Sequence, residues 1–386
     1  MIALVVCGVI PLGIWVYLLV GRGMFWLARE RDDRSQPAQL KVWPAVVAVV
    51  PARNEADVIA RAIGSLAAQD YPGPFRIVLV DDQSDDGTAD IARQAAAANG
   101  ASDRLEVIAG RPLPAGWVGK MWAVNQGVAR ADHVQPEYLW LTDADIGHAP
   151  DNLRHLVARA QAGRLSLVSL MVRLKCDTWA DRMMIPAFVF FFDMLFPFRW
   201  VNQPSRRISA GAGGCMLVRR TSLEAAGGIA SIKDAIIDDC ALAARLKRQG
   251  PIWLGLTLRA ESLRAYGSMG EIGRMVSRSA YAQLNYSLLL LAGTLLGMLL
   301  TYIAPPFAAL FGSGPLRALG LLTWLMMAMS FQPMLKLYKA SPLWGLALPL
   351  IGLLYTVFTV QSAMQVWSGR GGMWKGRAQA LAGVER

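Results

Sequence analysis

The sequence has few of the residues that build disulfide frameworks or zinc sites. Its 386 residues include 4 cysteines and 3 histidines. The cysteines show neither Cys-x-x-Cys pairs nor any other spacing of metal ligands. Nothing therefore calls for an oxidising compartment, and we expect reduced cysteines that mostly serve in packing. They are Cys7, Cys176, Cys215 and Cys240.

Charged residues are also scarce, and most of them are basic. They make up 17% of the chain against 54% hydrophobic residues, a balance that points away from soluble proteins and towards membrane association. The net charge is +11, but no basic run is interleaved with aromatic residues, so we expect no nucleic-acid partner. Basic residues instead lie beside apolar segments, as in residues 21–34, where they suit anionic lipid headgroups.

A long apolar segment lies at the beginning of the chain. Residues 2–20 are almost wholly apolar, with no basic region before them and no small-residue cleavage site after them. The sequence therefore predicts a retained transmembrane anchor at 1–24. Basic residues follow the anchor, and by the positive-inside rule they place that side in the cytoplasm.

Further apolar segments fill the C-terminal region, residues 286–367, where we expect about three crossings of ~20 residues each. The segments are 286–311, 316–334 and 342–367. Pro305 and Pro306 predict a kink, or a broken and partly re-entrant helix, in the first of them. Three crossings would place the basic tail, 368–386, outside, whereas its charge favours the inside, and the sequence leaves both open.

Residues 42–280 have a different character, because short β-rich apolar runs alternate with amphipathic helical patterns. This alternation predicts an α/β domain with a mostly parallel sheet, flanked by transmembrane helices. Strands are expected at 46–52, 76–82, 104–110, 138–145 and 165–174, and helices near 55–68, 87–99, 119–130 and 150–162.

Three of the predicted strands end in polar sequences. These are residues 51–59 (PARNEADVI), 80–88 (VDDQSDDGT) and 142–146 (TDADI). Parallel sheets bind their ligands at the carboxyl ends of the strands, so the three ends together indicate a site. Asp143 and Asp145, spaced i, i+2 at one strand end, offer the oxygen ligands that Mg²⁺ or Mn²⁺ prefers. The alternative is a polar strand end that caps the next helix.

These stretches occur in one order with two others, 119–125 (GKMWAVN) and 238–242 (DDCAL). Over about residues 44–280 the chain resembles the inverting family 2 glycosyltransferases. The resemblance implies a GT-A fold, a nucleotide-sugar donor and a divalent cation, Mg²⁺ or Mn²⁺, bound by an Asp-x-Asp motif. The flanking apolar segments are similar to those of the membrane-bound members.

The resemblance also implies roles for single residues. Asp143 would lie towards the sugar and ribose, and it would share the metal site with Asp145, which binds the cation directly. Asp82, beside Asp81, would accept a hydrogen bond from the uracil of a UDP-sugar. The residues expected to contact the donor are Glu55, Asp81, Asp82, Lys120, Asp143, Arg274 and Arg278. Ordinary alternatives are helix capping for the acids, a surface position for the lysine and lipid headgroup contacts for the arginines.

An inverting transfer needs a general base to take the proton of the acceptor hydroxyl. Residues 236–250 begin with two acids at a predicted helix start and resemble the Glu-Asp-x-x-Leu element that supplies this base. Asp238 then stands in the position of the glutamate, and Asp239 is the expected catalytic base. The alternative is an acidic pair that only stabilises the helix start.

Processive members of the family carry a Gln-x-x-Arg-Trp element after this helix. The nearest counterpart here is 274–278 (RMVSR), followed by Ser279, so the Gln and the Trp are both missing. This departure argues against a polymer-extruding synthase. Arg274 and Arg278 would lie on one helix face, where they could clamp a diphosphate.

Two other positions have two interpretations each. His148 could add a ligand to the metal site, although a loop histidine is more often incidental. Trp117 lies in the Pro- and Gly-rich stretch 112–119 and could belong to a flap over the site or be packed. Residues 185–200 are largely apolar and predict either an interfacial element or a buried helix.

The combination of 113–123, 138–146, 185–198, 212–220 and 236–243 closely resembles the hopene-associated glycosyltransferases of bacterial hopanoid gene clusters. It implies a sugar transferred to, or near, a polycyclic triterpenoid lipid, by a multi-pass protein of the bacterial inner (cytoplasmic) membrane with a cytoplasmic catalytic domain. The alternatives are a processive polysaccharide synthase and a non-catalytic membrane scaffold with a degenerate nucleotide-binding domain.

Overall fold

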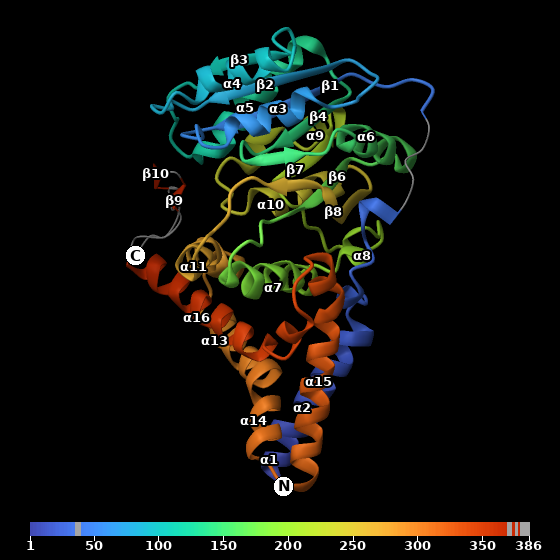
Figure 1. Cartoon of the computed structure of the whole chain (residues 1–386), viewed down its shortest axis with the longest axis vertical. Helices are drawn as coiled ribbons and strands as arrows, with labels where there is room; N and C mark the ends of the chain where they lie inside the picture. Colours follow the sequence, from blue (N-terminus) through green and yellow to red (C-terminus); the bar gives the residue numbers. More distant parts are fainter. Residues whose placement is uncertain (35–39, 369–372, 375–376, 379–386) are drawn as a thin grey trace. The chain divides into compact units, whose positions relative to one another are not determined.

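The structure is a computed structural model, and it describes residues 1–34 and 40–368 together with the backbone of 373–374 and 377–378. The predicted basic tail, 368–386, therefore lies almost wholly outside the described residues. Contacts divide the described chain into two compact units (Figure 1). A sheet unit takes Glu30–Lys175 and Trp200–Arg264, and a helical unit takes Met1–Arg29, Cys176–Arg199 and residues 265–368.

The sheet unit contains one mixed sheet of eight strands in the order β3-β2-β1-β4-β7-β6-β8-β5. Strands β3, β2, β1 and β4 are mutually parallel, β6 is parallel to β8, and β7 runs antiparallel between β4 and β6. The strands are β1 (Val46–Ala52), β2 (Phe75–Asp81), β3 (Leu105–Ala109), β4 (Tyr138–Thr142), β5 (Ile146–His148), β6 (Leu167–Arg173), β7 (Cys215–Arg219) and β8 (Ile252–Ser262). The expected α/β class and mostly parallel sheet are confirmed.

Helices cover both faces of this sheet, as expected for strands that are apolar on both sides (Figure 1). Alternate residues of the strands pack against α3, α4 and α6 in one continuous apolar core, and the other residues face α5 and α10. The helices are α3 (Ile59–Ala67), α4 (Thr88–Ala98), α5 (Gly119–Ala131), α6 (Asn152–Gly163), α9 (Arg220–Ala225) and α10 (Asp238–Lys247), with short turns at Asp32–Arg34, Asp132–Val134 and Ile229–Ile232 (η6).

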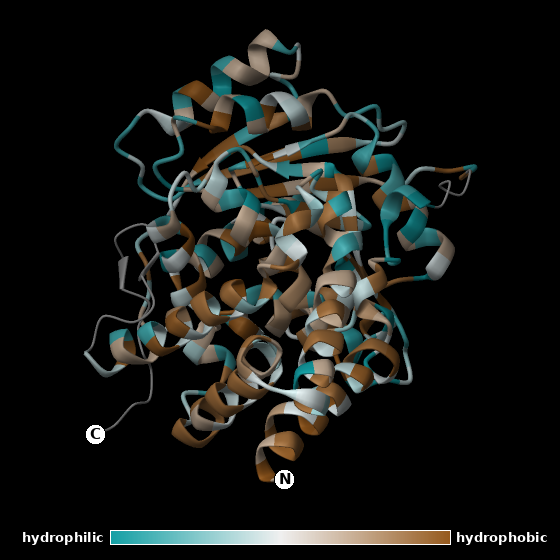
Figure 2. Cartoon of the chain, turned by 60° about the horizontal axis from the view of Figure 1, so that its bottom comes forward, coloured by the Kyte–Doolittle hydropathy of each residue, from teal (hydrophilic) through white to brown (hydrophobic). Residues whose placement is uncertain are grey.

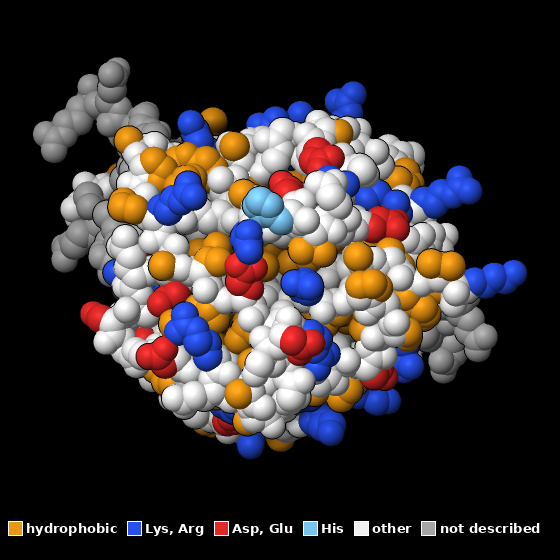
Figure 3. All heavy atoms as spheres, turned by 90° about the horizontal axis from the view of Figure 1, so that it is seen from above, with side chains coloured by type: hydrophobic (Ala, Val, Ile, Leu, Met, Phe, Trp, Pro, Cys, Tyr) orange, Lys and Arg blue, Asp and Glu red, His pale blue; other side chains and the backbone are white. Residues whose placement is uncertain are grey.

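On the outer surface, Figure 3 shows basic and acidic side chains interspersed with apolar ones across the visible face. The four cysteines are free thiols, in agreement with the expectation from their spacing.

The helical unit is built from apolar helices, which Figure 2 colours largely brown. Four of them are long and apolar enough to cross a membrane: Ile2–Gly21, Leu288–Phe311, Gly314–Leu337 and Leu348–Trp367. They comprise α1 (Ile2–Leu4), η1 (Val5–Val9), α2 (Ile10–Val16) and η2 (Tyr17–Gly21); α13 (Leu288–Met298), η7 (Leu299–Ile303) and α14 (Ala304–Phe311); α15 (Gly314–Leu337); and α16 (Leu348–Trp367). The unit also has α7 (Trp179–Leu195), α11 (Met269–Ser277), α12 (Ala280–Gln283) and the turns Phe25–Leu27 and Pro342–Gly345, while α8 (Phe198–Val201) contains the boundary between the units.

Pro305 and Pro306 do not break their helix. The backbone stays helical from Leu288 to Phe311 and forms a π-helical turn, η7, directly before the prolines. A π turn absorbs the missing amide donors and the ring clash that proline brings to an α-helix.

Helix α7 is packed within the helical unit, which favours the buried-helix interpretation of residues 185–200. The Tyr355 hydroxyl of α16 donates to the Met184 carbonyl at 2.9 Å. Phe191 lies edge-on to Tyr302 and Tyr355, with ring centroids 5.7 and 5.0 Å away. At the end of the helix, Arg22 donates to the carbonyls of Met194 and Leu195, which a helix C-terminus leaves without intrahelical partners.

Gly127 allows α5 to lie directly on the sheet. A Cβ there would overlap a methyl group of Val49 and would lie 3.0 Å from Cγ2 of Val80. Helix α5 carries the lysine of the GKMWAVN stretch at its first turn, so this close approach also sets the height of that lysine above the sheet.

We therefore expect Gly127→Val to lower the free energy of unfolding by about 2 kcal/mol through overpacking. Because the valine would displace α5, it should also weaken ligand binding at the carboxyl edge of the sheet. Ala129→Val, at an exposed position of the same helix, is the matched control. Thermal unfolding of the detergent-solubilised chain measures both variants. Equal melting temperatures for the two would contradict this account of the packing.

Candidate active site

The loops that follow β1 and β2 are tied together at the carboxyl edge of the sheet. The strands are parallel, and their last residues, Ala52 and Asp81, are in register. The Asn54 amide donates to Ser84 Oγ at 3.0 Å, and the Asp85 amide donates to Asn54 Oδ1 at 3.1 Å. Asn54 has a φ of 51°, a left-handed conformation that asparagine tolerates better than most residues. The first two polar strand ends therefore form one structure.

Asp81 and Asp82 lie at this edge in different environments. Asp81 Oδ1 accepts a hydrogen bond from the Ser84 amide at 3.2 Å, which is the turn-capping role of an aspartate. Asp82 is buried, with 1% of its surface exposed, and Arg53 donates to its carbonyl at 2.6 Å. A contact with a nucleoside stays a prediction for both.

Glu55 belongs to an ionic cluster around Arg264. The Arg264 guanidinium donates to Glu55 Oε2 at 2.6 Å and to Asp57 at 3.0 Å, and its Nε lies 4.0 Å from Asp145 Oδ2. Arg264 lies two residues after the end of β8. The residue between them is Leu263, and its amide donates to the Asp145 carbonyl at 2.7 Å. The cluster therefore joins the first polar strand end to the Asp-x-Asp stretch.

The pKa of Asp145 is raised to about 6. Burial is the main cause, and the charges of Asp143 and Glu55 add to it, while Arg264 and Lys120 act in the opposite direction. A further positive charge nearby would stabilise the ionised form of a carboxyl group in this position.

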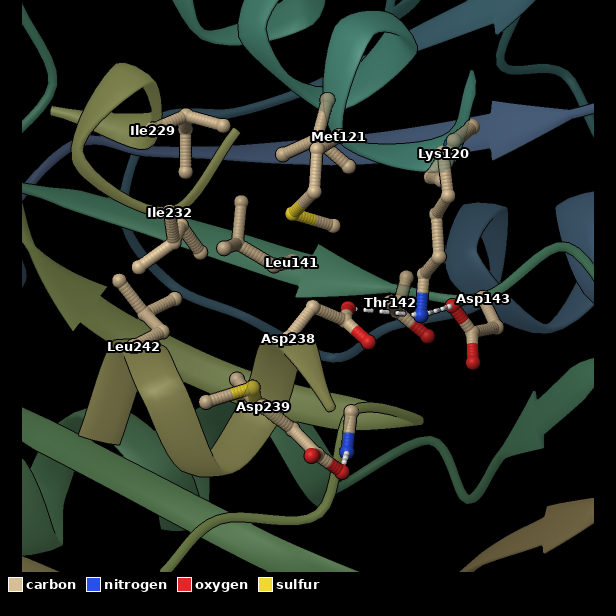
Figure 4. A pocket seen from close by; sticks show the side chains of 14 residues that line it. Lys120, Met121, Leu141, Thr142, Asp143, Ile229, Ile232, Asp238, Asp239 and Leu242 are labelled. Atoms are coloured by element: carbon tan, nitrogen blue, oxygen red, sulfur yellow. Dashed lines mark hydrogen bonds and ion pairs between the residues drawn. The ribbon is translucent and has the colours of Figure 1, made fainter. Parts of the chain in front are cut away.

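Lys120 connects two motifs that are far apart in the sequence. Its Nζ lies 2.9 Å from Asp143 Oδ1 and 3.2 Å from Asp238 Oδ2, and Figure 4 shows the ammonium between the two carboxylates. Burial alone would lower the pKa of Lys120, but the charges of Asp143 and Asp238 raise it above its ordinary value. Lys120 therefore stays protonated.

Asp239 begins α10 together with Asp238, and both of its oxygens accept backbone hydrogen bonds. The Gly213 amide donates to Oδ2 at 3.0 Å, and the Cys240 amide donates to Oδ1 at 2.7 Å. Burial and then the Asp238 charge raise the pKa of Asp239 to about 6, against the opposing effects of Lys120 and the two amides. A carboxylate has room for further hydrogen bonds beyond these two, and a pKa near 6 suits a general base near neutral pH.

These residues line a pocket with one polar and one apolar side (Figure 4). Lys120, Asp143, Asp238 and Asp239 form the polar side. The apolar side takes residues from α5, β4, β7, η6 and α10, namely Met121, Val124, Leu141, Met216, Ile229, Ile232 and Leu242. Charged groups and hydrocarbon side chains therefore face the same cavity.

The two carboxylates of the Asp-x-Asp stretch fit a divalent cation, because Asp145 is mostly buried and also lies among the negative charges of Asp143 and Glu55. Among the residues that the structure describes, no group of three or more His, Cys, Asp and Glu side chains is placed to hold a metal ion. A cation held by Asp143 and Asp145 would complete its coordination with water and substrate oxygens, as Mg²⁺ commonly does.

A comparison with known families agrees with this arrangement. Residues 47–227 match the family described as "Glycosyl transferase family 2". Most of the matched residues lie in the sheet unit, which we call the glycosyltransferase domain from here on. The match includes the three polar strand ends and Lys120, and it stops before α10, so Asp238 and Asp239 lie beyond it.

Two relatives of this glycosyltransferase domain have names that mention lipids. The beta-monoglucosyldiacylglycerol synthase of Trichormus variabilis is 29% identical over 211 residues, which cover 53% of this chain and 41% of the synthase. The undecaprenyl-phosphate 4-deoxy-4-formamido-L-arabinose transferase of Edwardsiella ictaluri is 31% identical over 139 residues, or 36% of this chain and 40% of that enzyme. The chain thus matches about two fifths of the length of these relatives.

Among solved structures, a mannosyltransferase from Pyrobaculum calidifontis, in complex with GDP-mannose and Mn²⁺, is similar in fold. The TM-score is 0.55 at 20% identity, and the match covers 93% of this chain and 98% of the mannosyltransferase. The expected GT-A fold is confirmed.

The structure brings most of the predicted site residues together at one edge of the glycosyltransferase domain, but two belong to the other unit. Glu55, Lys120, Asp143, Asp145 and Asp239 are linked by the contacts described above. Arg274 and Arg278 lie at the end of α11 in the helical unit, and a donor contact for them stays a prediction. The Arg274 side chain is 71% exposed and pairs with Glu271 at 3.8 Å.

The sequence-based prediction did not include Arg264. The sequence does contain a signal that could have identified it. Residues 252–262, which end two positions before Arg264, have the period-2 apolar pattern that is typical of a strand. Because β8 was not identified as a strand, Arg264 was not recognised as a strand-end residue like those of β1, β2 and β4.

His148 and Trp117 both have packing roles in the glycosyltransferase domain. His148 is buried; Asn152 Nδ2 lies 3.0 Å from its Nδ1, and Thr142 Oγ1 lies 2.9 Å from its Nε2. Both ring nitrogens thus have protein partners, so His148 is not an available metal ligand. Trp117 packs edge-on against Trp122, with centroids 5.1 Å apart, and the next amide, of Val118, donates to the Lys233 carbonyl at 2.8 Å.

Burial lowers the pKa of His148 to about 3, and this predicts a pH dependence of stability. Between pH 6.5 and 3 the unfolded chain binds a proton that the folded chain does not, so stability falls as the pH drops through this window. The expected contribution is about 2 kcal/mol between pH 6.5 and 4.5. His148→Gln removes it, and melting temperatures across this range should then fall less steeply than in the wild type. His133→Gln, at an exposed position, is the control; the same slope in wild type and His148→Gln would exclude a neutral buried histidine.

Proposed function

We propose that the protein is a membrane-bound inverting glycosyltransferase that transfers a sugar from a nucleotide-sugar, a UDP-sugar in particular, to a lipid acceptor. The observation that carries the proposal is the convergence of Lys120, Asp143 and Asp239 on one pocket at the edge of a family 2 domain. These residues come from three separate motifs, and a set of helix caps would not require them to meet.

In the proposed reaction the acceptor hydroxyl attacks the anomeric carbon of the donor sugar. Asp239 takes the hydroxyl proton as the new C–O bond forms, and the bond between the anomeric carbon and the diphosphate oxygen breaks. The nucleoside diphosphate leaves with the electron pair, and the configuration at the anomeric carbon inverts. A base of this kind contributes a factor of about 10²–10⁴ in rate.

The donor would lie along the edge formed by the three strand ends. Asp143 and Asp145 would hold the divalent cation, which offsets the charge of the departing diphosphate when it is bound. Asp82 and Glu55 would contact the nucleoside, and Asp81 would order the turn beside it. Lys120 would face the donor from α5.

Two observations support a lipid acceptor. The described part of the chain has four helices that are long and apolar enough to cross a membrane, and hydrocarbon side chains form one side of the pocket that holds Asp239. The two relatives described above are named for transfers that involve lipids. Within this class, the resemblance to hopene-associated glycosyltransferases favours a polycyclic triterpenoid acceptor in a bacterial inner membrane, with the glycosyltransferase domain on the cytoplasmic side.

The proposed division of labour predicts different defects in two isosteric variants. Asp145→Asn should abolish Mn²⁺-dependent binding of UDP, because it removes a metal ligand. Asp239→Asn should leave that binding intact and should lower transfer at least about 100-fold, because it removes the base. Calorimetric titration of UDP with and without Mn²⁺, together with transfer assays, separates the two. Equal loss of UDP binding in both variants would refute these roles.

The acceptor class predicts a change in membrane lipids. A strain that lacks the gene should lose a glycolipid, and the wild-type gene should restore it, whereas a gene encoding Asp145→Asn should not. Radiolabelled UDP-sugars should label material that is extractable into chloroform and methanol. Label that appears only in a high-molecular-weight polymer would favour a polysaccharide synthase, and full restoration by Asp145→Asn would favour a non-catalytic scaffold.

A further inference from the structure

Lys120 lies where it can act on the base as well as on the donor. Its ammonium is 2.9 Å from Asp143, which belongs to the Asp-x-Asp stretch, and 3.2 Å from Asp238, the neighbour of Asp239. A lysine that only contacted the donor would not need to pair with Asp238, and it would not need to lie beside the start of α10.

The surroundings of Asp239 balance one positive charge against one negative charge. Asp238 is adjacent on α10, and its charge favours the protonated form of Asp239. Lys120, from α5, favours the ionised form. The other groups that face Asp239 are the thiol of Cys240, which burial keeps protonated, and the backbone of the loop before β7, which contributes the Gly213 amide. Lys120 is thus the cation that offsets Asp238.

Small residues permit this arrangement. A Cβ on Gly213 would lie 3.4 Å from Lys120 Nζ and 3.5 Å from Asp239 Cβ, so the lysine and the base both lie close to this glycine. The three groups are packed closely enough for the lysine charge to act at short range, where Coulomb interactions are strongest and screening by solvent is weakest.

We propose that Lys120 is a positioning residue for the base: its ammonium, held between Asp143 and Asp238, ties the start of α10 to the metal-side carboxylate and keeps Asp239 ionised. The catalytic part of this inference, in which Asp239 acts as the base, rests on the proposed function. The electrostatic link itself is a property of the folded chain and can be tested without a substrate.

The link predicts opposite effects for the two partners of the ion pair. Removal of the positive charge in Lys120→Met should raise the pKa of Asp239 by about one unit, because an opposite charge at this range lowers a carboxyl pKa by one to three units. Removal of the negative charge in Asp238→Asn should lower it. Lys120→Arg should leave it close to the wild-type value. A role of Lys120 in folding alone would not give shifts of opposite sign.

Labelling by dicyclohexylcarbodiimide measures the pKa of Asp239 directly, because the reagent reacts with protonated carboxyl groups. The full chain in detergent is labelled across pH 4–8, and mass spectrometry quantifies the adduct on the peptide that carries Asp239, with Asp239→Asn as the blank. The expected labelling midpoint is near pH 6 in the wild type, about one unit higher in Lys120→Met and lower in Asp238→Asn. Lys233→Met, which removes an exposed lysine of a neighbouring segment, is the matched control and should leave the midpoint unchanged.

The pH dependence of UDP release from UDP-glucose with Mn²⁺ provides a second readout. The acidic limb of kcat/KM should move in the same direction as the labelling midpoint in each variant. If Lys120→Met does not fold, Lys120→Gln takes its place. A midpoint that is the same in wild type and in the folded neutral variant would overturn the inference. A wild-type chain that releases no UDP from any UDP-sugar would instead count against the proposed function, and the labelling result would still decide the link.

Discussion

The site depends on how two cations hold a crowded group of carboxylates at one edge of the sheet. Each acid carries a charge that its neighbours repel, and partial burial strengthens this repulsion because the local dielectric constant falls. Lys120 and Arg264 each pair with acids from two different segments of the chain, so each cation joins two segments of the edge. The acids are Glu55, Asp57, Asp143, Asp145 and Asp238. An anionic ligand such as a diphosphate would add negative charge here, which is a physical reason for a divalent cation to accompany it.

Helix α5 contributes to both sides of the pocket. Lys120 and Met121 are adjacent in its first turn, yet one lies on the polar side and the other on the apolar side. The height of the helix is set further along, where Gly127 lies against Val49 and Val80. A packing contact in the core thus determines the position of a charge at the surface.

The parts of the fold that follow from local patterns could be predicted from the sequence. Residues 46–52 and 76–82 are predicted as strands because their apolar runs end in polar turns, and the structure has β1 at Val46–Ala52 and β2 at Phe75–Asp81. A parallel sheet then brings the ends of these strands together. The pairing of Lys120 with Asp238 could not be predicted in this way, because it joins residues that are distant in the sequence and depends on α5 and α10 lying on the same face. The environment of His148 likewise depends on Asn152 and Thr142 meeting inside the core. For residues 185–200, composition could not separate an interfacial helix from a buried one, and the aromatic contacts of α7 were needed to do so.

The order of strands in the sheet has a consequence for how the protein is made. Strand β7 lies between β4 and β6, and β5 pairs with β8, so the sheet cannot close until residues near 262 have left the ribosome. Helix α7 lies in the sequence between β6 and β7, and it is synthesised while β4 and β5 still have open edges, which are prone to wrong pairing. The partners of α7 described above, Tyr302 and Tyr355, follow β8 in the sequence, so the sheet can be complete before α7 reaches its final packing. The two compact units are therefore interleaved in the order of synthesis, because the helical unit receives segments from before, within and after the sheet.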